Sequence, residues 1–189
     1  PRTSRLISAS ALLALDIAWV PIAHAQKASA APPPVHSTST GEWPSYAGDV
    51  RGSRYAPLAQ ITAANFGTLE VAWRFKTDQL GARPEYKIEG TPLMVSGVLY
   101  ATGGSPRAAV ALGAATGEVL WTHSESEGER GAAAPRQLSG RGLSYWSDGT
   151  EERILYVTPG YQLIELDART GVRVPGFGSG GAVDLKLDD

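Results

Sequence analysis

Short apolar runs, separated by polar or glycine-containing turns, dominate the chain from residue 90 onward. Residues 90–100 read as two strands joined at Ser96-Gly97, a dipeptide suited to a compact hairpin turn. The runs 110–112 and 119–121 flank a second hairpin turn at 115–118. This pattern predicts one four-stranded antiparallel sheet.

The same pattern returns further along the chain. The run Val98 to Thr102 recurs as Ile154 to Thr158, 56 residues later, and Thr116-Gly117 recurs as Thr170-Gly171, 54 residues later. Repeats of this length, made of short strands, are typical of β-propeller blades, which stack around an axis where such folds hold a ligand. The chain is therefore predicted to be an all-β propeller, with further strands at 143–146, 154–157 and 163–166.

Two blades alone do not close a propeller. The alternating residues 69–75 predict one additional half-buried strand, in which Trp73 is a core aromatic wedged between blades, as Trp121 is in the first blade. Open sheet edges remain, and a propeller needs at least about four blades. Residues 41–189 are therefore expected to be the opening segment of a longer propeller, and this segment alone is expected to be inactive.

The stretch 125–140 is charged, rich in glycine and alanine, and has no periodicity. It predicts a long loop between the blades, and such loops are often functional. The three glutamates of this loop are interpreted as solvated: Glu125, Glu127 and Glu129. His123, which precedes them among serines and glutamates, is expected to be exposed.

The N-terminus predicts export. Two arginines precede an apolar run over 6–20, and Ala23-His24-Ala25 fits a small-x-small cleavage site. Residues 1–25 are therefore predicted to be a signal peptide, which makes the protein periplasmic or secreted. A membrane anchor and a buried helix are the alternatives; the run is short for a membrane span, and Asp16 interrupts it.

Residues 26–40 are rich in small residues and contain three consecutive prolines. Such a segment cannot build a core, so it predicts a disordered linker in which His36 is solvated. Ordered structure is expected to begin near Gly41.

Composition narrows the choice of partners and cofactors. Seventeen basic and nineteen acidic side chains give a net charge of −2, which does not favour nucleic acid. The sequence contains no cysteine, so it has no disulfides or thiolate metal sites.

Four stretches, in this order and spacing, resemble the pyrroloquinoline-quinone (PQQ) dehydrogenases, most closely the glucose, quinate and polyol type. They run from Trp43 to Trp73, from Glu89 to Tyr100, from Arg141 to Trp146, and from Ile154 to Gly178. Each motif alone is weak evidence for the family, but the order and spacing of the four motifs together are specific.

The resemblance implies an eight-bladed propeller with PQQ on the axis beside a bound Ca²⁺. It implies an oxidoreductase that oxidises an alcohol, polyol or sugar hydroxyl. Two electrons enter the quinone and pass on to ubiquinone or a cytochrome. The cofactor supplies the difficult chemistry and the protein positions it.

The resemblance also assigns three cofactor-binding residues. Arg141 aligns with the family arginine that reaches PQQ, and a guanidinium suits an anionic quinone with three carboxylates. Glu89 is expected to orient Arg141 or to accept a cofactor proton. Thr158 aligns with a threonine whose hydroxyl meets a cofactor carboxylate. The structural alternatives are an exposed loop arginine, a strand-end glutamate and a capping threonine, and Thr102 holds the position equivalent to Thr158 in the first blade.

One departure separates this chain from part of the family. Alcohol-oxidising relatives carry adjacent cysteines shortly before the Arg-Gly motif, where this chain has residues 134–140 without cysteine. On this ground the chain does not resemble the methanol or ethanol branch. The family's Ca²⁺ ligands and catalytic base come from later blades, so no catalytic residue and no metal ligand is assigned here.

Two rival functions remain open at this point. The same blades would also suit a non-enzymatic propeller that serves as a binding or assembly scaffold of the cell envelope. A propeller hydrolase is the second rival, but no Ser-His-Asp set or glutamate pair supports it.

Overall fold

The computed structural model describes residues 36–81, 88–138, 140 and 142–186. The described residues all belong to one unit, Ala31–Asp189. The predicted signal peptide and most of the predicted linker lie outside the described residues.

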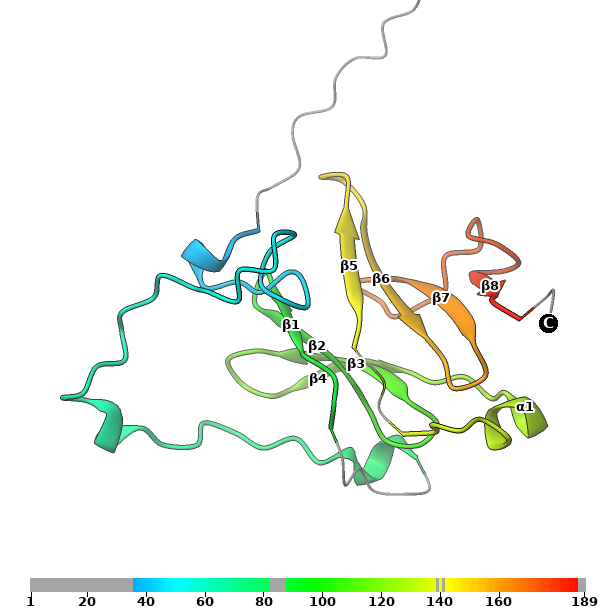
Figure 1. Cartoon of the computed structure of the whole chain (residues 1–189), viewed down its shortest axis with the longest axis horizontal. Helices are drawn as coiled ribbons and strands as arrows, with labels where there is room; N and C mark the ends of the chain where they lie inside the picture. Colours follow the sequence, from blue (N-terminus) through cyan, green and yellow to red (C-terminus); the bar gives the residue numbers. More distant parts are fainter. Residues whose placement is uncertain (1–35, 82–87, 139, 141, 187–189) are drawn as a thin grey trace, which may run out of the picture. The chain divides into compact units, whose positions relative to one another are not determined.

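The first blade is the predicted four-stranded antiparallel sheet (Figure 1). Its strands are β1 (Leu93–Val95), β2 (Val98–Gly103), β3 (Ala108–Gly113) and β4 (Val119–His123). Ser96 and Gly97 join β1 to β2 with positive φ angles of 50° and 79°. This left-handed pair gives the tight hairpin that the sequence predicted.

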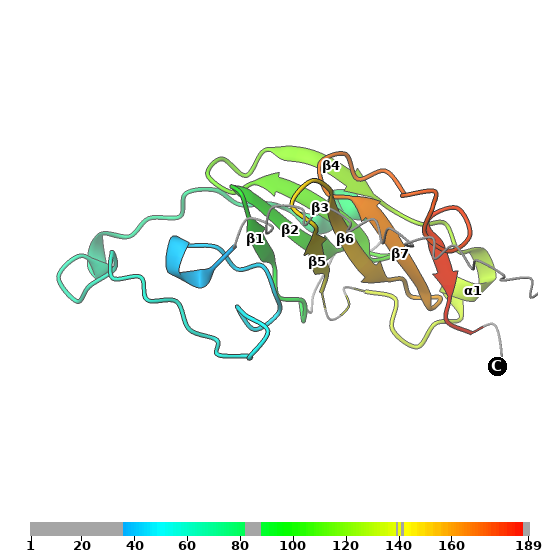
Figure 2. The ribbon, with the colours of Figure 1, turned by 90° about the horizontal axis from the view of Figure 1, so that it is seen from above.

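The second blade repeats this arrangement (Figure 2). Its strands are β5 (Ser144–Ser147), β6 (Glu152–Val157), β7 (Gln162–Asp167) and β8 (Ala182–Asp184). The first three were predicted, and β8 was not. It pairs with β7 through Ala182 and Ile164 after a glycine-rich loop that hides the repeat in the sequence.

The two blades share one hydrophobic core. The first blade contributes Leu93, Tyr100 and Trp121, and the second contributes Ile154 and Leu166, all of them buried. Burying each aliphatic side chain of this size stabilises the fold by roughly 1.5–3 kcal/mol. Alternation along β6 and β7 turns Ile154 and Leu166 to the same face, so the period of two in the sequence produces the interface between blades.

Two tryptophan–glycine contacts of the same kind each join neighbouring segments of the chain. The ring of Trp121 lies against Gly171, and its Nε1 donates to the carbonyl oxygen of Ala168 at 2.9 Å. In the same way the ring of Trp73 lies against Gly117, and its Nε1 donates to Ala114 O at 3.0 Å. Trp121, which is buried, therefore occupies the predicted wedge position between the blades. Trp73 is only half-buried and contacts the first blade alone, so its predicted place between two blades is not found in the described residues.

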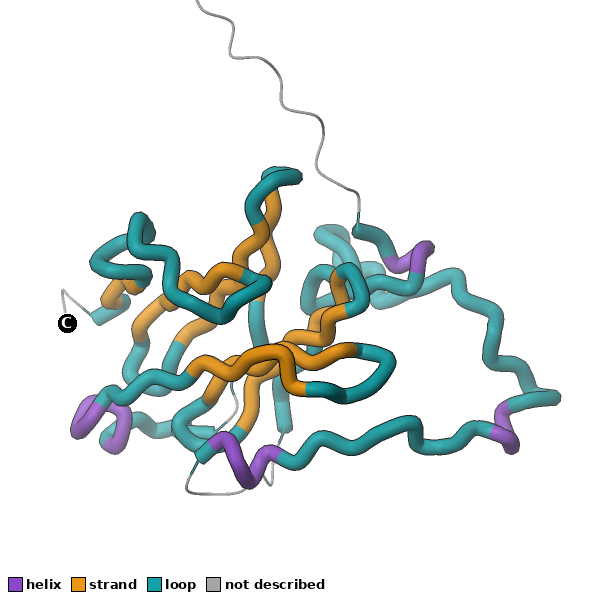
Figure 3. Tube along the Cα trace, turned by 180° about the vertical axis from the view of Figure 1, so that it is seen from behind, coloured by secondary structure: helices purple, strands orange, loops and turns teal. Residues whose placement is uncertain are grey.

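The predicted strand over 69–75 is absent, because these residues pair with no strand in the described part of the chain. Figure 3 shows this region as loop, within a segment that has short 3-10 turns at Thr38–Thr40, Phe66–Thr68 and Thr77–Leu80. Extended backbone becomes a strand only beside another strand. Phe66, Leu69 and Val71 remain exposed here.

Ordered structure begins earlier than the predicted Gly41. Ser37 caps the turn Thr38–Thr40 by accepting from Ser39 N. His36 is not solvated as predicted, since its side chain is 12% exposed and its Nδ1 lies 2.5 Å from Glu42 Oε2. The His36 ring also packs edge-on against Tyr145 of β5, which fixes the chain on the second blade.

Two of the three glutamates predicted to be solvated, Glu125 and Glu127, are engaged with the protein, whereas Glu129 is exposed as predicted. Their loop, which follows β4, contains the short helix α1 (Gly128–Ala132). Glu125 is 13% exposed and forms a two-point ion pair with Arg173, and it also contacts His123 at 2.5 Å. His123, predicted to be exposed, packs edge-on against Tyr156. The loop is therefore held to the second blade by charge pairs.

Candidate cofactor site

A hollow of about 1030 Å³ lies where the two blades meet. This volume stands at the upper end of the roughly 300–1,000 Å³ that small-molecule sites occupy. Its wall includes Glu89 before β1, Thr158 after β6 and the loop residues Pro135 and Arg136. Two of the three residues that the sequence assigned to a cofactor thus border one space.

Two glycines let the Glu89 and Arg141 motifs meet. Gly142 forms a bridge with Thr91, and a Cβ added to Gly142 would lie 3.3 Å from Thr91 O. Gly142 also has a φ of 107°, a conformation that favours glycine. A Cβ on Gly90 would lie 3.5 Å from the Cα of Gly142. The backbones on either side of the hollow approach closely because both positions lack side chains.

Arg141 itself lies outside the described residues. Its neighbours Gly140 and Gly142 line the hollow, so the glycine of the Arg-Gly motif lies at the site. Contact between the Arg141 side chain and a cofactor stays a prediction.

Glu89 interacts with an arginine that the sequence did not single out. Its Oε2 accepts from Arg136 Nη1 at 3.0 Å. The Arg136 side chain is 68% exposed, so this pair adds little to stability. The pair instead affects position: it connects Glu89, which precedes β1, to the loop that forms part of the wall of the hollow.

Thr158 is buried, and its hydroxyl is engaged with the protein. The Oγ1 donates to Glu127 Oε1 at 2.5 Å and accepts from Gln162 N at 3.0 Å. The second oxygen of Glu127 accepts from Gly160 N at 2.7 Å. Because a hydroxyl has one hydrogen, a cofactor carboxylate would receive it only after displacing Glu127.

A second contact fixes the turn that follows Thr158. Arg130 of α1 donates from Nε to Gly160 O at 2.5 Å and pairs through both terminal nitrogens with Asp184 of β8. Hydrogen bonding to Arg130 lowers the pKa of Asp184 to about 2. Glu127 and Arg130 together hold the 158–160 turn from the side of α1. Neither role is predicted from the sequence, because the partners lie some thirty residues away along the chain.

Two further hydroxyl groups are unusual, one in the lining of the hollow and one next to Gly90. Within the described residues, Thr102 Oγ1 and Tyr156 Oη are buried without a hydrogen-bond partner. Tyr156 lines the hollow, and burial raises its pKa. A Cβ on Gly90 would lie 3.3 Å from Thr102 Oγ1, so this hydroxyl sits directly beneath the Glu89 motif. Buried polar groups of this kind are expected to gain a partner when a polar ligand binds.

The charges along the wall suit an anionic ligand. Arg107 and Arg136 border the hollow, against one carboxylate, Glu89. A planar quinone with three carboxylates fits this combination of guanidinium groups, the unpartnered hydroxyl group of Tyr156 and close glycine backbone.

The described residues contain no group of three or more His, Cys, Asp and Glu side chains able to hold a metal. Within the same residues, no helix has both the length and the apolar character that crossing a bilayer requires.

Comparisons with known proteins agree with this geometry. The family model described as the glucose/ethanol/alcohol dehydrogenase β-propeller domain, labelled PQQ, matches residues 43–188. The quinone alcohol dehydrogenase subunit of Gluconobacter oxydans is 36% identical over 173 residues, covering 88% of this chain and 21% of that protein. The quinoprotein glucose dehydrogenase of the same organism is 30% identical over 179 residues, covering 86% and 22%. These identities do not separate sugar-oxidising from alcohol-oxidising relatives, although the chain lacks the adjacent cysteines.

Solved structures agree as well. The quinohemoprotein alcohol dehydrogenase ADHIIG of Pseudomonas putida HK5 superposes with a TM-score of 0.62 at 27% identity, covering 80% of this chain and 20% of that one. A europium-containing methanol dehydrogenase gives a TM-score of 0.58 at 27% identity, covering 69% and 22%. The chain spans about a fifth of the length of these relatives. With two blades in place and a family model matched over nearly all of the described residues, the chain belongs to the β-propeller family of the PQQ-dependent glucose, ethanol and alcohol dehydrogenases.

Proposed function

We propose that this chain supplies two blades and one wall of the cofactor pocket in a longer PQQ-dependent dehydrogenase. The observation that carries the proposal is the hollow between the blades, bordered by Glu89, Thr158 and the glycines that flank Arg141. PQQ, when bound, supplies the capacity to take two electrons from a substrate hydroxyl. The residues of this chain would hold its carboxylates and quinone oxygens.

The substrate class that this proposal names is a sugar, polyol or alcohol with an oxidisable carbinol. Support comes from relatives named as alcohol, glycerol and glucose dehydrogenases. The proposed electron acceptor is a quinone or a cytochrome, since one relative is named for a quinone and another for cytochrome c. Calcium is proposed as the accompanying ion, with its ligands supplied by the rest of the longer protein.

We also propose that the protein is exported to the periplasm or secreted. The support is the arrangement of residues 1–25, in which arginines, an apolar run and a small-residue motif follow one another. N-terminal sequencing of the mature protein tests this, with cleavage after Ala25 as the expected result and an intact N-terminus as the contrary one.

The experiment for the main proposal is reconstitution of the full-length protein. Apoprotein is titrated with PQQ in the presence of Ca²⁺, and dye reduction is then measured with a panel of alcohols, polyols and sugars. Saturable binding and substrate-dependent reduction are expected. A folded protein that binds no PQQ would contradict the proposal and favour a non-enzymatic propeller scaffold.

A further inference from the structure

Arg107 makes an unusual set of contacts at the site. It lies in the turn between β2 and β3, with a φ of 66°, and its guanidinium donates to three backbone carbonyl oxygens. The Nε donates to Leu138 O at 2.9 Å, one terminal nitrogen to Arg136 O at 3.0 Å, and the other to Val157 O at 3.0 Å. One side chain of the first blade therefore holds two other segments of the chain.

Both of these segments contribute to the wall of the hollow. Arg136 belongs to the loop before the Arg-Gly motif, and Val157 ends β6 directly before Thr158. Both residues line the hollow, as Arg107 does. The Arg107 guanidinium thus links this part of the loop directly to the last residue of β6.

Gly140 lies close to the Arg107 guanidinium because it has no side chain. A Cβ at Gly140 would lie 2.8 Å from Arg107 Nε and 2.9 Å from its Cζ, closer than such atoms approach. The loop therefore lies directly against the guanidinium. Arginine suits these contacts, because its guanidinium carries donors on three separate nitrogens held in one plane, whereas lysine has a single nitrogen.

We propose that Arg107 is a positioning residue of the cofactor site: it holds the loop 136–138 and the end of β6 at the separation that the bound cofactor requires. The inference rests on the proposed function, and it assigns no contact between Arg107 and the reacting atoms. Loss of the Arg107 guanidinium is expected to loosen the wall of the hollow. It should weaken cofactor binding more than it lowers the stability of the fold.

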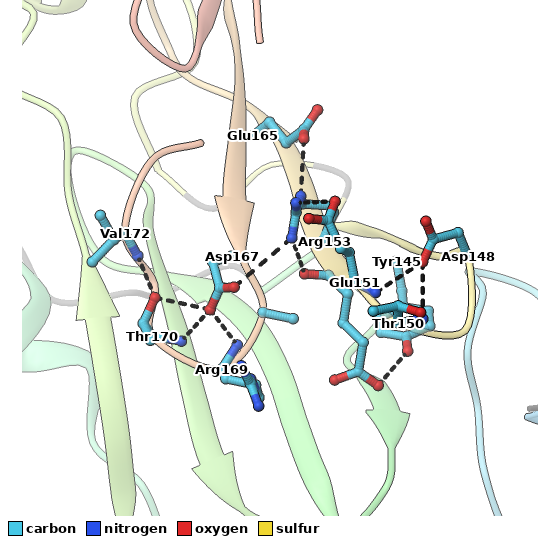
Figure 4. Close-up of polar contacts among 12 residues, drawn as sticks. Tyr145, Asp148, Thr150, Glu151, Arg153, Glu165, Asp167, Arg169, Thr170 and Val172 are labelled. Atoms are coloured by element: carbon cyan, nitrogen blue, oxygen red, sulfur yellow. Dashed lines mark hydrogen bonds and ion pairs between the residues drawn. The ribbon is translucent and has the colours of Figure 1, made fainter. Parts of the chain in front are cut away.

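The test compares Arg107→Lys with Arg153→Lys in the full-length protein. Arg153 is a matched control, because it is similarly engaged, with Glu151, Glu165 and Asp167, yet does not line the hollow (Figure 4). The readouts are the melting temperature of the apoprotein and the dissociation constant for PQQ. Arg107→Lys is expected to raise that constant about tenfold, because a loosened wall must be ordered when PQQ binds and this ordering costs binding free energy. Arg153→Lys is expected to leave it unchanged.

Equal PQQ affinity in the folded Arg107→Lys variant and the wild type would overturn the inference. If that variant does not fold, Gly140→Ala decides, because it keeps Arg107 and displaces the loop from it: weaker PQQ binding supports the inference and unchanged binding overturns it. A wild-type protein that binds no PQQ would instead refute the proposed function.

Discussion

The indole of Trp121 lies flat against Gly171, and its Nε1 donates to the carbonyl oxygen of Ala168, 47 residues along the chain. A Cβ on Gly171 would stand 2.6 Å from the ring. This contact seats the last strand of the first blade on the final hairpin of the second. Because Glu89 precedes one blade and Thr158 belongs to the other, the same contact contributes to how the two sides of the hollow are placed.

The Trp121 contact predicts a strong effect of Gly171→Ala. Gly171 has a φ of 68°, so alanine is strained there by about 1–2 kcal/mol, and its methyl group also collides with the indole. Gly97→Ala is the matched control, since Gly97 has a φ of 79° but open space around a Cβ. Urea unfolding of the full-length protein should show a clearly larger loss of stability for Gly171→Ala. Equal losses would mean that the ring does not rest on Gly171.

The hydrogen bond between Thr158 and Glu127 predicts that substitutions at these two positions have coupled effects on stability. Thr158→Val leaves a carboxylate oxygen of Glu127 without its donor, which should cost about 1.5–3 kcal/mol of unfolding free energy. Thr158→Ser keeps the hydroxyl and should cost less. In a Glu127→Ala background the Thr158→Val change should lose most of its effect. Additive effects in this double-mutant cycle would show that the two side chains act independently.

The ion pair between Glu125 and Arg173 predicts a pH dependence of stability. Burial alone would raise the pKa of Glu125, but hydrogen bonds from Arg173 and His123 outweigh it and hold the pKa below the ordinary value of 4.5. The stabilisation is therefore present above that ordinary value and is lost as the pH falls through the lowered pKa.

Chemical unfolding at about pH 6 and about pH 3 measures this effect. The loss of stability between the two should be smaller in Glu125→Gln than in the wild type. Glu129→Gln, which changes an exposed carboxylate of the same loop, should behave as the wild type does. An unchanged pH dependence in Glu125→Gln would contradict the role given to this pair.

The repeated strands could be predicted from the sequence because their signal is local. Ile154, Tyr156 and the turn at Thr170-Gly171 carry the alternation and the turn chemistry within a few residues. Strand β8 escaped prediction because Ala182–Asp184 is short and follows a glycine-rich loop. Residues 69–75 have the alternation of a strand, yet a strand also needs a neighbour, which the described residues do not provide.

The residues of the site also differ in whether a local sequence signal predicts them. Glu89 and Thr158 were found through motifs, and the structure places both at one hollow. Glu127 and Arg107 were missed because their partners lie 29 to 50 residues away along the chain. From the sequence, a glutamate in a loop and an arginine in a turn are expected to be solvent-exposed. Only the fold brings the buried Thr158 hydroxyl beside Glu127 and three carbonyl groups beside Arg107.

The central claim is that the hollow between the two blades is one wall of a PQQ site. A crystal structure of the full-length protein with PQQ and Ca²⁺ tests it most directly. Cofactor density should lie in the hollow between Glu89 and Thr158, with Gly142 at its edge. Cofactor density elsewhere in the propeller, with this hollow filled by solvent, would contradict the account.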